Sequence, residues 1–170
     1  MSYCDFAHGH PIHGPYHDSE YGFPLRDDNE FFERLVLEIN QAGLSWLTIL
    51  KKRDAFREAF AGFNIARVAR FTAGDRQRLM RNEGIIRNRL KIDAAIENAK
   101  RLLTLGSFSK WLDAHRGLSK DEWVKLFKRT FVFTGGEITS SFLISIGYLP
   151  GAHDETCPVY KKIKGLRTQD

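Results

Sequence analysis

The spacing of apolar and polar residues predicts helices along most of the chain. Apolar residues recur three or four positions apart over 30–42 and over 89–103, which is the period of an amphipathic helix. The same period continues in shorter predicted helices at 45–52, 54–63, 65–71 and 73–82, and between 107 and 130. A further apolar helix ends at Gly147. Strand-type alternation is weak throughout, so we predict an all-α fold.

Local signals mark where some helices begin and where regular structure is not expected. Asp27 or Asp28 could cap the first of these helices, and Ser45 could cap the second. Residues 1–28 are rich in glycine, proline and aromatic side chains, so we expect little regular structure there. The basic tail, 158–170, is also expected to be partly unstructured.

A glycine-containing turn between two predicted helices is the most specific local pattern, and the whole unit covers 73–103. Gly84 lies at the bend, and the basic residues Arg87, Arg89 and Lys91 follow it. Amides in such a turn, together with the N-terminus of the next helix, can bind a DNA phosphate, and the basic side chains would add charge. An ordinary helical hairpin with a solvated basic turn has the same pattern, so both interpretations stay open at this point.

Polar side chains interrupt the apolar stretch Leu37–Leu50. Glu38 and Trp46 could line a pocket for a planar ring, because such pockets combine an aromatic surface with a few fixed polar groups. Buried carboxylates are more often paired with Lys or Arg, and a buried tryptophan more often packs in a core. The stretch therefore supplies a hypothesis with two ordinary alternatives.

Length, charge and cysteine content narrow the class of protein. A chain of 170 residues favours a single domain over 1–170, and a net charge of +5 favours a polyanionic partner only mildly. Two cysteines are too few for a disulfide-built secreted fold. The sequence has no signal pattern and no apolar run near the length of a membrane span, so we expect no membrane contact and a cytoplasmic protein.

Two pairs of zinc-type ligands lie near opposite ends of the chain: Cys4 and His17, then His153 and Cys157. Two thiolates and two imidazoles suit a closed, tetrahedral, structural zinc site. Such an ion would tether the N-terminal arm, 1–28, to the C-terminal segment, 150–158. The spacing alone leaves two alternatives open, namely spare cysteines and a site that uses a different histidine. The rival histidines are His8, His10 and His13.

Four segments together resemble the bacterial 3-methyladenine DNA glycosylase I family: YHDSEYG (16–22), LEINQAGLSW (37–46), TILKKRDAFREAF (48–60) and NEGIIRNRLKIDAAIENA (82–99). The resemblance implies a helix-hairpin-helix glycosylase fold with zinc-tethered termini. It implies an enzyme that flips an alkylated purine, chiefly 3-methyladenine, out of double-stranded DNA and hydrolyses its N-glycosidic bond. Cys4, His17, His153 and Cys157 match the family's zinc ligands in type, order and local spacing.

The resemblance also implies roles for individual side chains. Glu38 corresponds to a base-binding residue whose charge favours a cationic purine, and it is the expected catalytic group. Tyr16 and Trp46 correspond to aromatic residues of the base pocket. His13 and Tyr21 stand where relatives carry a tyrosine and a tryptophan, so they are further base-binding candidates.

Glu137, after a pair of glycines, is unexpected in this family and could be an extra carboxylate near the site. Two other functions remain open. The first is the same fold and chemistry acting on a different damaged base. The second is a zinc-stabilised DNA-binding module without catalysis. In each case we expect a monomer.

Overall fold

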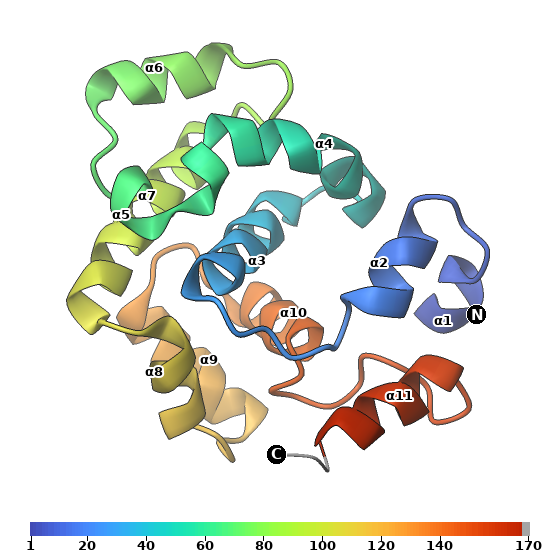
Figure 1. Ribbon diagram of the computed structural model, residues 1–170. Helices are drawn as coiled ribbons and strands as arrows, with labels where there is room; N and C mark the ends of the chain where they lie inside the picture. Colours follow the sequence, from blue (N-terminus) through green and yellow to red (C-terminus); the bar gives the residue numbers. More distant parts are fainter. Residues whose placement is uncertain (168–170) are drawn as a thin grey trace. The chain divides into compact units, whose positions relative to one another are not determined.

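The computed structural model describes residues 1–167, and every regular element in that range is a helix (Figure 1). The elements are α1 (Tyr3–Ala7), α2 (His13–Ser19), α3 (Asp28–Gln41), α4 (Trp46–Ala59), the short 3-10 helix η1 (Ala61–Phe63), α5 (Ile65–Val68), α6 (Ala73–Arg81), α7 (Arg89–Leu105), α8 (Phe108–Ala114), α9 (Lys120–Thr130), α10 (Gly136–Ser145) and α11 (Pro158–Arg167). The predicted all-α class is confirmed for these residues. None of these helices combines the length and apolar character that a membrane crossing requires.

The chain forms two compact units. The smaller consists of Met1–Leu25 with the described residues from Leu143 onward, and the larger consists of Arg26–Phe142. The prediction of one domain over 1–170 stays a prediction. The candidate metal ligands lie in the smaller unit, whereas Glu38, Trp46 and the glycine-containing turn lie in the larger one.

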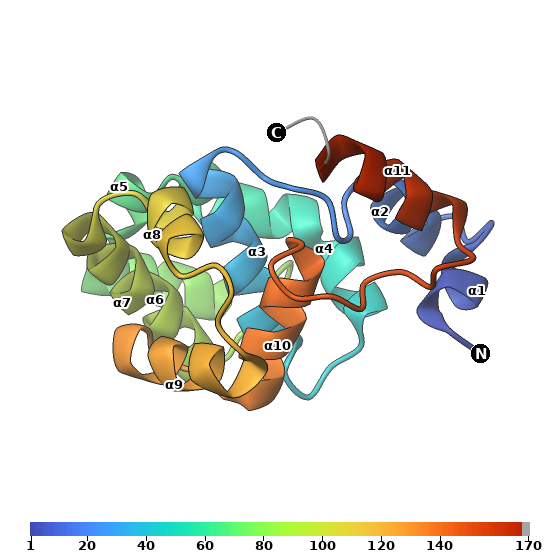
Figure 2. The same ribbon diagram turned by 90° about the horizontal axis from the view of Figure 1, so that it is seen from below.

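Phenylalanine rings fill the core of the larger unit. Phe108 stacks on Phe142 with ring centroids 5.8 Å apart, and Phe127 and Phe131 pack against the same cluster. Full burial of each ring contributes on the order of 1.5–3 kcal/mol. The cluster joins α8, α9 and α10, and α10 lies beside α3 in both ribbon views (Figures 1 and 2). This packing places the start of α10 near the end of α3.

Two predicted caps are confirmed, and one predicted helix break is wrong. Asp27 accepts a hydrogen bond from the backbone of α3, and Ser45 accepts one from the backbone of Thr48 in α4. However, α4 continues unbroken through Lys52–Asp54, where two helices were expected. The polar residues there interrupt the apolar pattern, but they include no glycine or proline that would end a helix.

Both chain ends are more regular than the sequence suggests. Residues 1–28 contain α1 and α2, and α1 begins with a capping box in which Ser2 and Asp5 exchange hydrogen bonds. The tail forms α11, which starts at Pro158 and buries Ile163. Proline suits the first position of a helix, and the buried isoleucine anchors the helix that follows. The last three residues of the expected loose tail lie outside the described residues.

Candidate active site and metal centre

Glu38 is a buried carboxylate on the inner face of α3. Its exposed fraction is 5%, and burial raises the pKa of the carboxyl to about 7, although the charge of Arg34 opposes the shift. The buried guanidinium of Arg34 offsets only part of this effect, so the carboxyl keeps a raised pKa. A buried anion in this state is stabilised by any cationic group that enters its surroundings.

Trp46 is the first residue of α4 and is half-buried. The short connection 42–45 separates it from α3, and Ser45 fixes the start of α4 by capping. Part of the Trp46 side chain stays exposed, although its Nε1 is buried, whereas Trp123 is only 1% exposed. Glu38 lies one helical turn before the same connection. The positions of the Glu38 and Trp46 side chains therefore both depend on the conformation of residues 42–45.

Lys91 holds the end of α3. Its ammonium donates to the carbonyl oxygens of Asn40 at 2.8 Å and Ala42 at 2.7 Å, and its exposed fraction is only 5%. Burial lowers its pKa. A cation at a helix C-terminus also interacts favourably with the helix dipole. The expectation that Lys91 contacts a DNA phosphate is therefore wrong, because its charge is used inside the fold.

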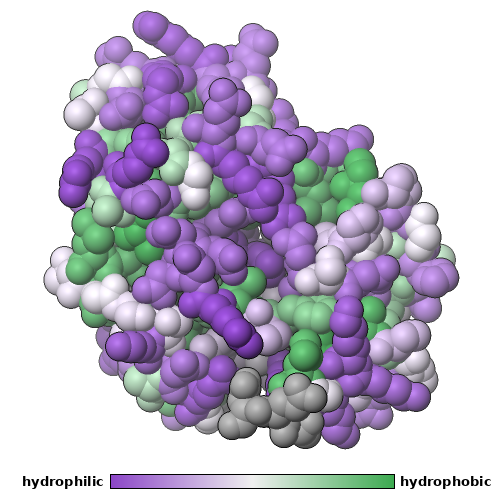
Figure 3. Space-filling model, viewed as in Figure 1, coloured by the Kyte–Doolittle hydropathy of each residue, from purple (hydrophilic) through white to green (hydrophobic). Residues whose placement is uncertain are grey.

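The glycine-containing turn is also partly used inside the fold. The Gly84 amide donates to the Asn82 side chain at 2.8 Å, and a Cβ on Gly84 would lie 2.9 Å from Ala55. Gly84 is thus required for close packing, and its amide is not available to a phosphate. Arg87 is exposed, and the side chain of Arg89 is 81% exposed. These two arginines can reach a polyanion, and hydrophilic side chains also cover nearby α6 (Figure 3).

A hollow of about 390 Å³ lies between the end of α3 and the start of α10. Its lining residues are Gln41, Ala42, Gly43, Gly135, Gly136, Glu137, Ile138 and Ser141. Glu137 is exposed at this hollow, on the first turn of α10. The sequence offered only the glycine pair as a signal, and nothing in it indicated that the pair faces the end of α3.

In the smaller unit, the three remaining base-binding candidates share one aromatic cluster. Tyr16 is buried, with its ring 5.7 Å from that of Tyr21. His13 lies 3.0 Å from the Tyr3 hydroxyl, and Tyr3 also contacts Tyr21 at 5.3 Å between ring centroids. Burial lowers the pKa of His13, so its ring is neutral at pH 7. Tyr3 also belongs to this cluster, although no neighbouring motif in the sequence marks it.

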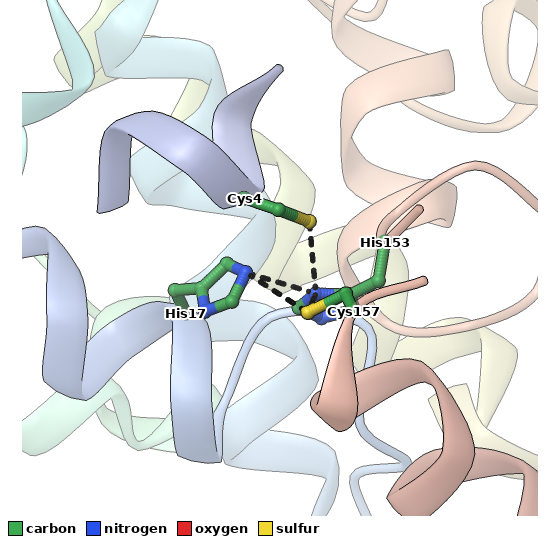
Figure 4. Close-up of side chains that lie close together, drawn as sticks. All are labelled: Cys4, His17, His153 and Cys157. Carbon is green, nitrogen blue, oxygen red and sulfur yellow. Dashed lines mark hydrogen bonds between the residues drawn. The ribbon is translucent and has the colours of Figure 1, made fainter. Parts of the chain in front are cut away.

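The four predicted metal ligands converge in the smaller unit. Figure 4 shows Cys4, His17, His153 and Cys157 turned toward one point, and their ligand atoms all lie within 4.8 Å of one another. Three of the four are buried, and Cys4 is half-buried. The rival histidines His8, His10 and His13 are not members of this group. The cluster could therefore hold a metal ion.

The hydrogen bonds of the two histidines favour a cation between them. His17 Nδ1 donates to Asp18 at 2.7 Å, and His153 Nε2 donates to the Tyr21 carbonyl at 2.6 Å. The other nitrogens, His17 Nε2 and His153 Nδ1, then carry lone pairs and face each other at 3.1 Å. Two facing lone pairs repel unless a cation lies between them. Outer hydrogen bonds of this kind commonly orient histidine ligands of metals.

Comparison with known proteins gives a consistent result across the chain. Residues 6–160 match the family model described as methyladenine glycosylase. The DNA-3-methyladenine glycosylase of Haemophilus influenzae is 36% identical over 178 residues, covering 91% of this chain and 96% of the relative. DNA-3-methyladenine glycosylase 1 of Escherichia coli is 35% identical over 187 residues, covering 94% and 97%.

A solved structure from the same family gives the same result. The 3-methyladenine DNA glycosylase I of Staphylococcus aureus, studied for its recognition of 3-methyladenine, superposes with a TM-score of 0.84 at 36% identity. The superposition covers 94% of this chain and 96% of that one.

Replacing Lys91 with methionine tests its role at the end of α3. Lys91→Met leaves two carbonyl oxygens without their donor, so the free energy of unfolding should fall by roughly 1–3 kcal/mol. Urea denaturation measures this change. Lys100→Met, an exposed position on the same helix, is the control and should change stability by less than about 0.5 kcal/mol. Equal stability of the two variants would show that Lys91 does not hold the connection.

The buried Glu38 carboxyl predicts a dependence of stability on pH. The unfolded carboxyl ionises near 4.5 and the folded one near 7, so the folded state keeps a proton that the unfolded state has lost between these values. Stability therefore falls as pH rises through this window. Glu38→Gln removes the effect and should be more stable than the parent by roughly 3 kcal/mol at pH 8, with little difference at pH 4.

Chemical denaturation at both pH values measures this difference. Glu97→Gln, at a half-buried position on α7 where the carboxylate pairs with Arg101, serves as the control and should not become more stable than the parent as pH rises from 4 to 8. A constant difference between Glu38→Gln and the parent from pH 4 to 8 would contradict the raised pKa.

Proposed function

This chain belongs to the methyladenine glycosylase family, and from that membership we propose that it is a DNA repair enzyme acting on alkylated purines, chiefly 3-methyladenine. The match over residues 6–160 carries the proposal. Glu38 supplies the physical reason for the substrate: a buried carboxylate whose charge Arg34 compensates only in part favours a base that alkylation has made positive.

The chemistry requires little acid catalysis. Adenine methylated at N3 is cationic and leaves the sugar as a neutral base, so its glycosidic bond is already weakened. The enzyme has to take the nucleotide out of the stack, hold the base and admit water to the sugar carbon. In this proposal Glu38 accepts hydrogen bonds from the flipped base and stabilises its charge. A normal neutral purine gains less from the same carboxylate.

Aromatic side chains are proposed to bind the flipped ring. Trp46 is half-buried and close to the connection that follows Glu38, and stacking of this kind is worth on the order of 1–3 kcal/mol per base. The assignment of Tyr16, with His13 and Tyr21, rests on the resemblance and on their shared aromatic cluster.

The larger unit is proposed to bind double-stranded DNA through a helix-hairpin-helix formed by α6, α7 and the turn between them. Arg87 and Arg89 supply exposed charge, and the first amides of α7 can face a phosphate. Lys91 and the Gly84 amide are used within the fold, so the phosphate contacts fall to the two arginines and to α7. A monomer stays the prediction for the assembly.

The metal is proposed to be a structural zinc ion. Two thiol and two imidazole ligands suit zinc, and four protein ligands leave no open position for catalysis. Bound zinc would supply a cross-link between the two chain ends of the smaller unit. Asp18 and the Tyr21 carbonyl hold the imidazole rings in the orientation that ligation requires.

Release of free base from methylated duplex DNA, followed by chromatography, tests the proposed function. The parent protein should release 3-methyladenine, and Glu38→Gln should lower kcat/KM roughly 10- to 100-fold, as expected for a lost hydrogen bond to a charged group. Glu97→Gln should retain full activity. Release of a different damaged base, with no 3-methyladenine, would favour the alternative substrate. No release of any base would exclude the enzyme.

The same assay across pH tests the state of the carboxylate. Because the proposed active form is ionised and burial raises its pKa to about 7, kcat/KM should rise through neutral pH. In Glu38→Gln this rise should be absent. A profile that is identical in the parent and the variant would assign the titration to another group.

Metal analysis and thermal unfolding test the zinc site. Purified protein should contain one zinc per chain, and a strong chelator should lower the Tm by several degrees. Cys157→Ser should lower zinc content and make the Tm insensitive to the chelator. His8→Asn is the matched control, because His8 lies outside the cluster. A metal-free protein with an unchanged Tm would exclude a structural ion.

A further inference from the structure

Phe133 has an unusual backbone conformation in the turn between α9 and α10. Its φ is +60°, in the left-handed region that favours glycine, and its side chain is 38% exposed. A bulky residue with positive φ is rare and costs free energy relative to glycine. Strain of this kind persists only where the surrounding structure imposes it, and it gathers at functional sites.

Buried polar side chains impose this conformation from both sides. Asn98 is fully buried and holds Val132 twice, accepting from its amide at 2.8 Å and donating to its carbonyl at 3.0 Å. Thr134 donates to the carbonyl of Phe127 at 3.1 Å, and Thr139 donates to that of Thr134 at 3.2 Å. The strained turn is therefore rigidly built, and the aromatic ring is held partly in solvent.

The turn leads to the proposed DNA-binding side of the larger unit. Arg101 contacts the carbonyl of Thr130, and Asn98 contacts Val132, so the chain runs along α7 toward the start of that helix. The next residues, Gly135 and Gly136, line the hollow at the end of α3.

The hollow connects this turn with the basic end of α7. Ala42 lines it from the side of α3, and the Ala42 carbonyl is held by Lys91 in the first turn of α7. The exposed Arg89 is the first residue of that turn, and the exposed Arg87 lies two residues before it. Phe133 is thus an exposed aromatic residue two positions before the glycines that line this hollow.

We propose that Phe133 packs against the sugar or base of a nucleotide next to the lesion in the bound duplex. The inference rests on the proposed function. Aromatic rings stack on any base, because every base presents an apolar face, and a fixed ring loses little freedom on contact. Holding the ring where DNA can contact it then explains the backbone strain at Phe133. Neither the base pocket nor the phosphate contacts require an aromatic ring at this position.

Binding to a duplex that carries a tetrahydrofuran abasic-site analogue tests the proposal. Removal of the ring in Phe133→Ala and Phe133→Gly should weaken binding about tenfold, equivalent to about 1.4 kcal/mol. Phe133→Tyr keeps the ring and should bind within twofold of the parent. Leu103→Ala removes another exposed apolar side chain, 50% exposed on a late turn of α7, and should also remain within twofold.

Comparing the two ring-less variants separates DNA contact from folding. Glycine relieves the positive φ whereas alanine does not, so Phe133→Gly should have a higher Tm than Phe133→Ala. If the ring acts on DNA, both variants lose the same affinity despite their different stability. If affinity instead follows stability, or if both variants bind within twofold of the parent, the proposal is wrong.

Two further readouts distinguish this proposal from the proposed function. Phe133→Gly should bind free 3-methyladenine as the parent does, because the ring is not part of the base pocket. A 2-aminopurine placed next to the analogue should change its fluorescence with the parent and Phe133→Tyr, but much less with Phe133→Gly. Parent protein that releases 3-methyladenine while the ring-less variants behave normally overturns this proposal alone. Parent protein that releases no base overturns both.

Discussion

The fold buries the Glu38 carboxylate with only partial electrostatic compensation from a cation. Glu38 lies in a helix whose other inward residues are mostly apolar, and the charge of Arg34 only partly offsets the cost of burial. A stable globular protein normally avoids this arrangement or neutralises the group. Its persistence is explained if a cationic base supplies the missing charge during function. Selection of an alkylated purine then follows from electrostatics that are built in before DNA binds.

The surrounding elements serve to fix the segments next to this carboxylate. Lys91 binds the carbonyls at the end of α3, and the start of α10 faces the same end across a hollow. The first turn of α7 therefore has two tasks, since its exposed side can carry DNA contacts while Lys91 reaches inward. In the smaller unit, a cluster of thiols and imidazoles joins the chain ends, which have little apolar core of their own.

Much of this arrangement could be predicted from the sequence, because helical period and capping are local properties. Asp27 and Ser45 were identified from single residues at helix starts. The family resemblance, confirmed by the comparisons, required several motifs together. The position of Lys91 after two basic residues suggests a solvent-facing cation, whereas its ammonium binds backbone carbonyls inside the fold. Its helical phase with Asn98 on the buried side of α7 was the signal that could have placed it inside.

Other features depend on contacts between distant segments and could not be predicted. The hollow between α3 and α10, the strained turn at Phe133 and the aromatic cluster around Tyr3 all arise from such packing. The short helices near the N-terminus are likewise stabilised by their surroundings more than by their own sequence. The roles assigned to Tyr16, His13 and Tyr21 remain predictions of the resemblance.

Direct titration of the Glu38 carboxyl tests whether burial raises its pKa before DNA binds. Carbon NMR of protein labelled at glutamate, with the signal assigned from its loss in Glu38→Gln, would follow ionisation of this one group with and without 3-methyladenine. We expect a midpoint near pH 7 in the free protein and a lower midpoint when the base is bound. A carboxyl that ionises at the ordinary value near 4.5, unaffected by the base, would contradict it.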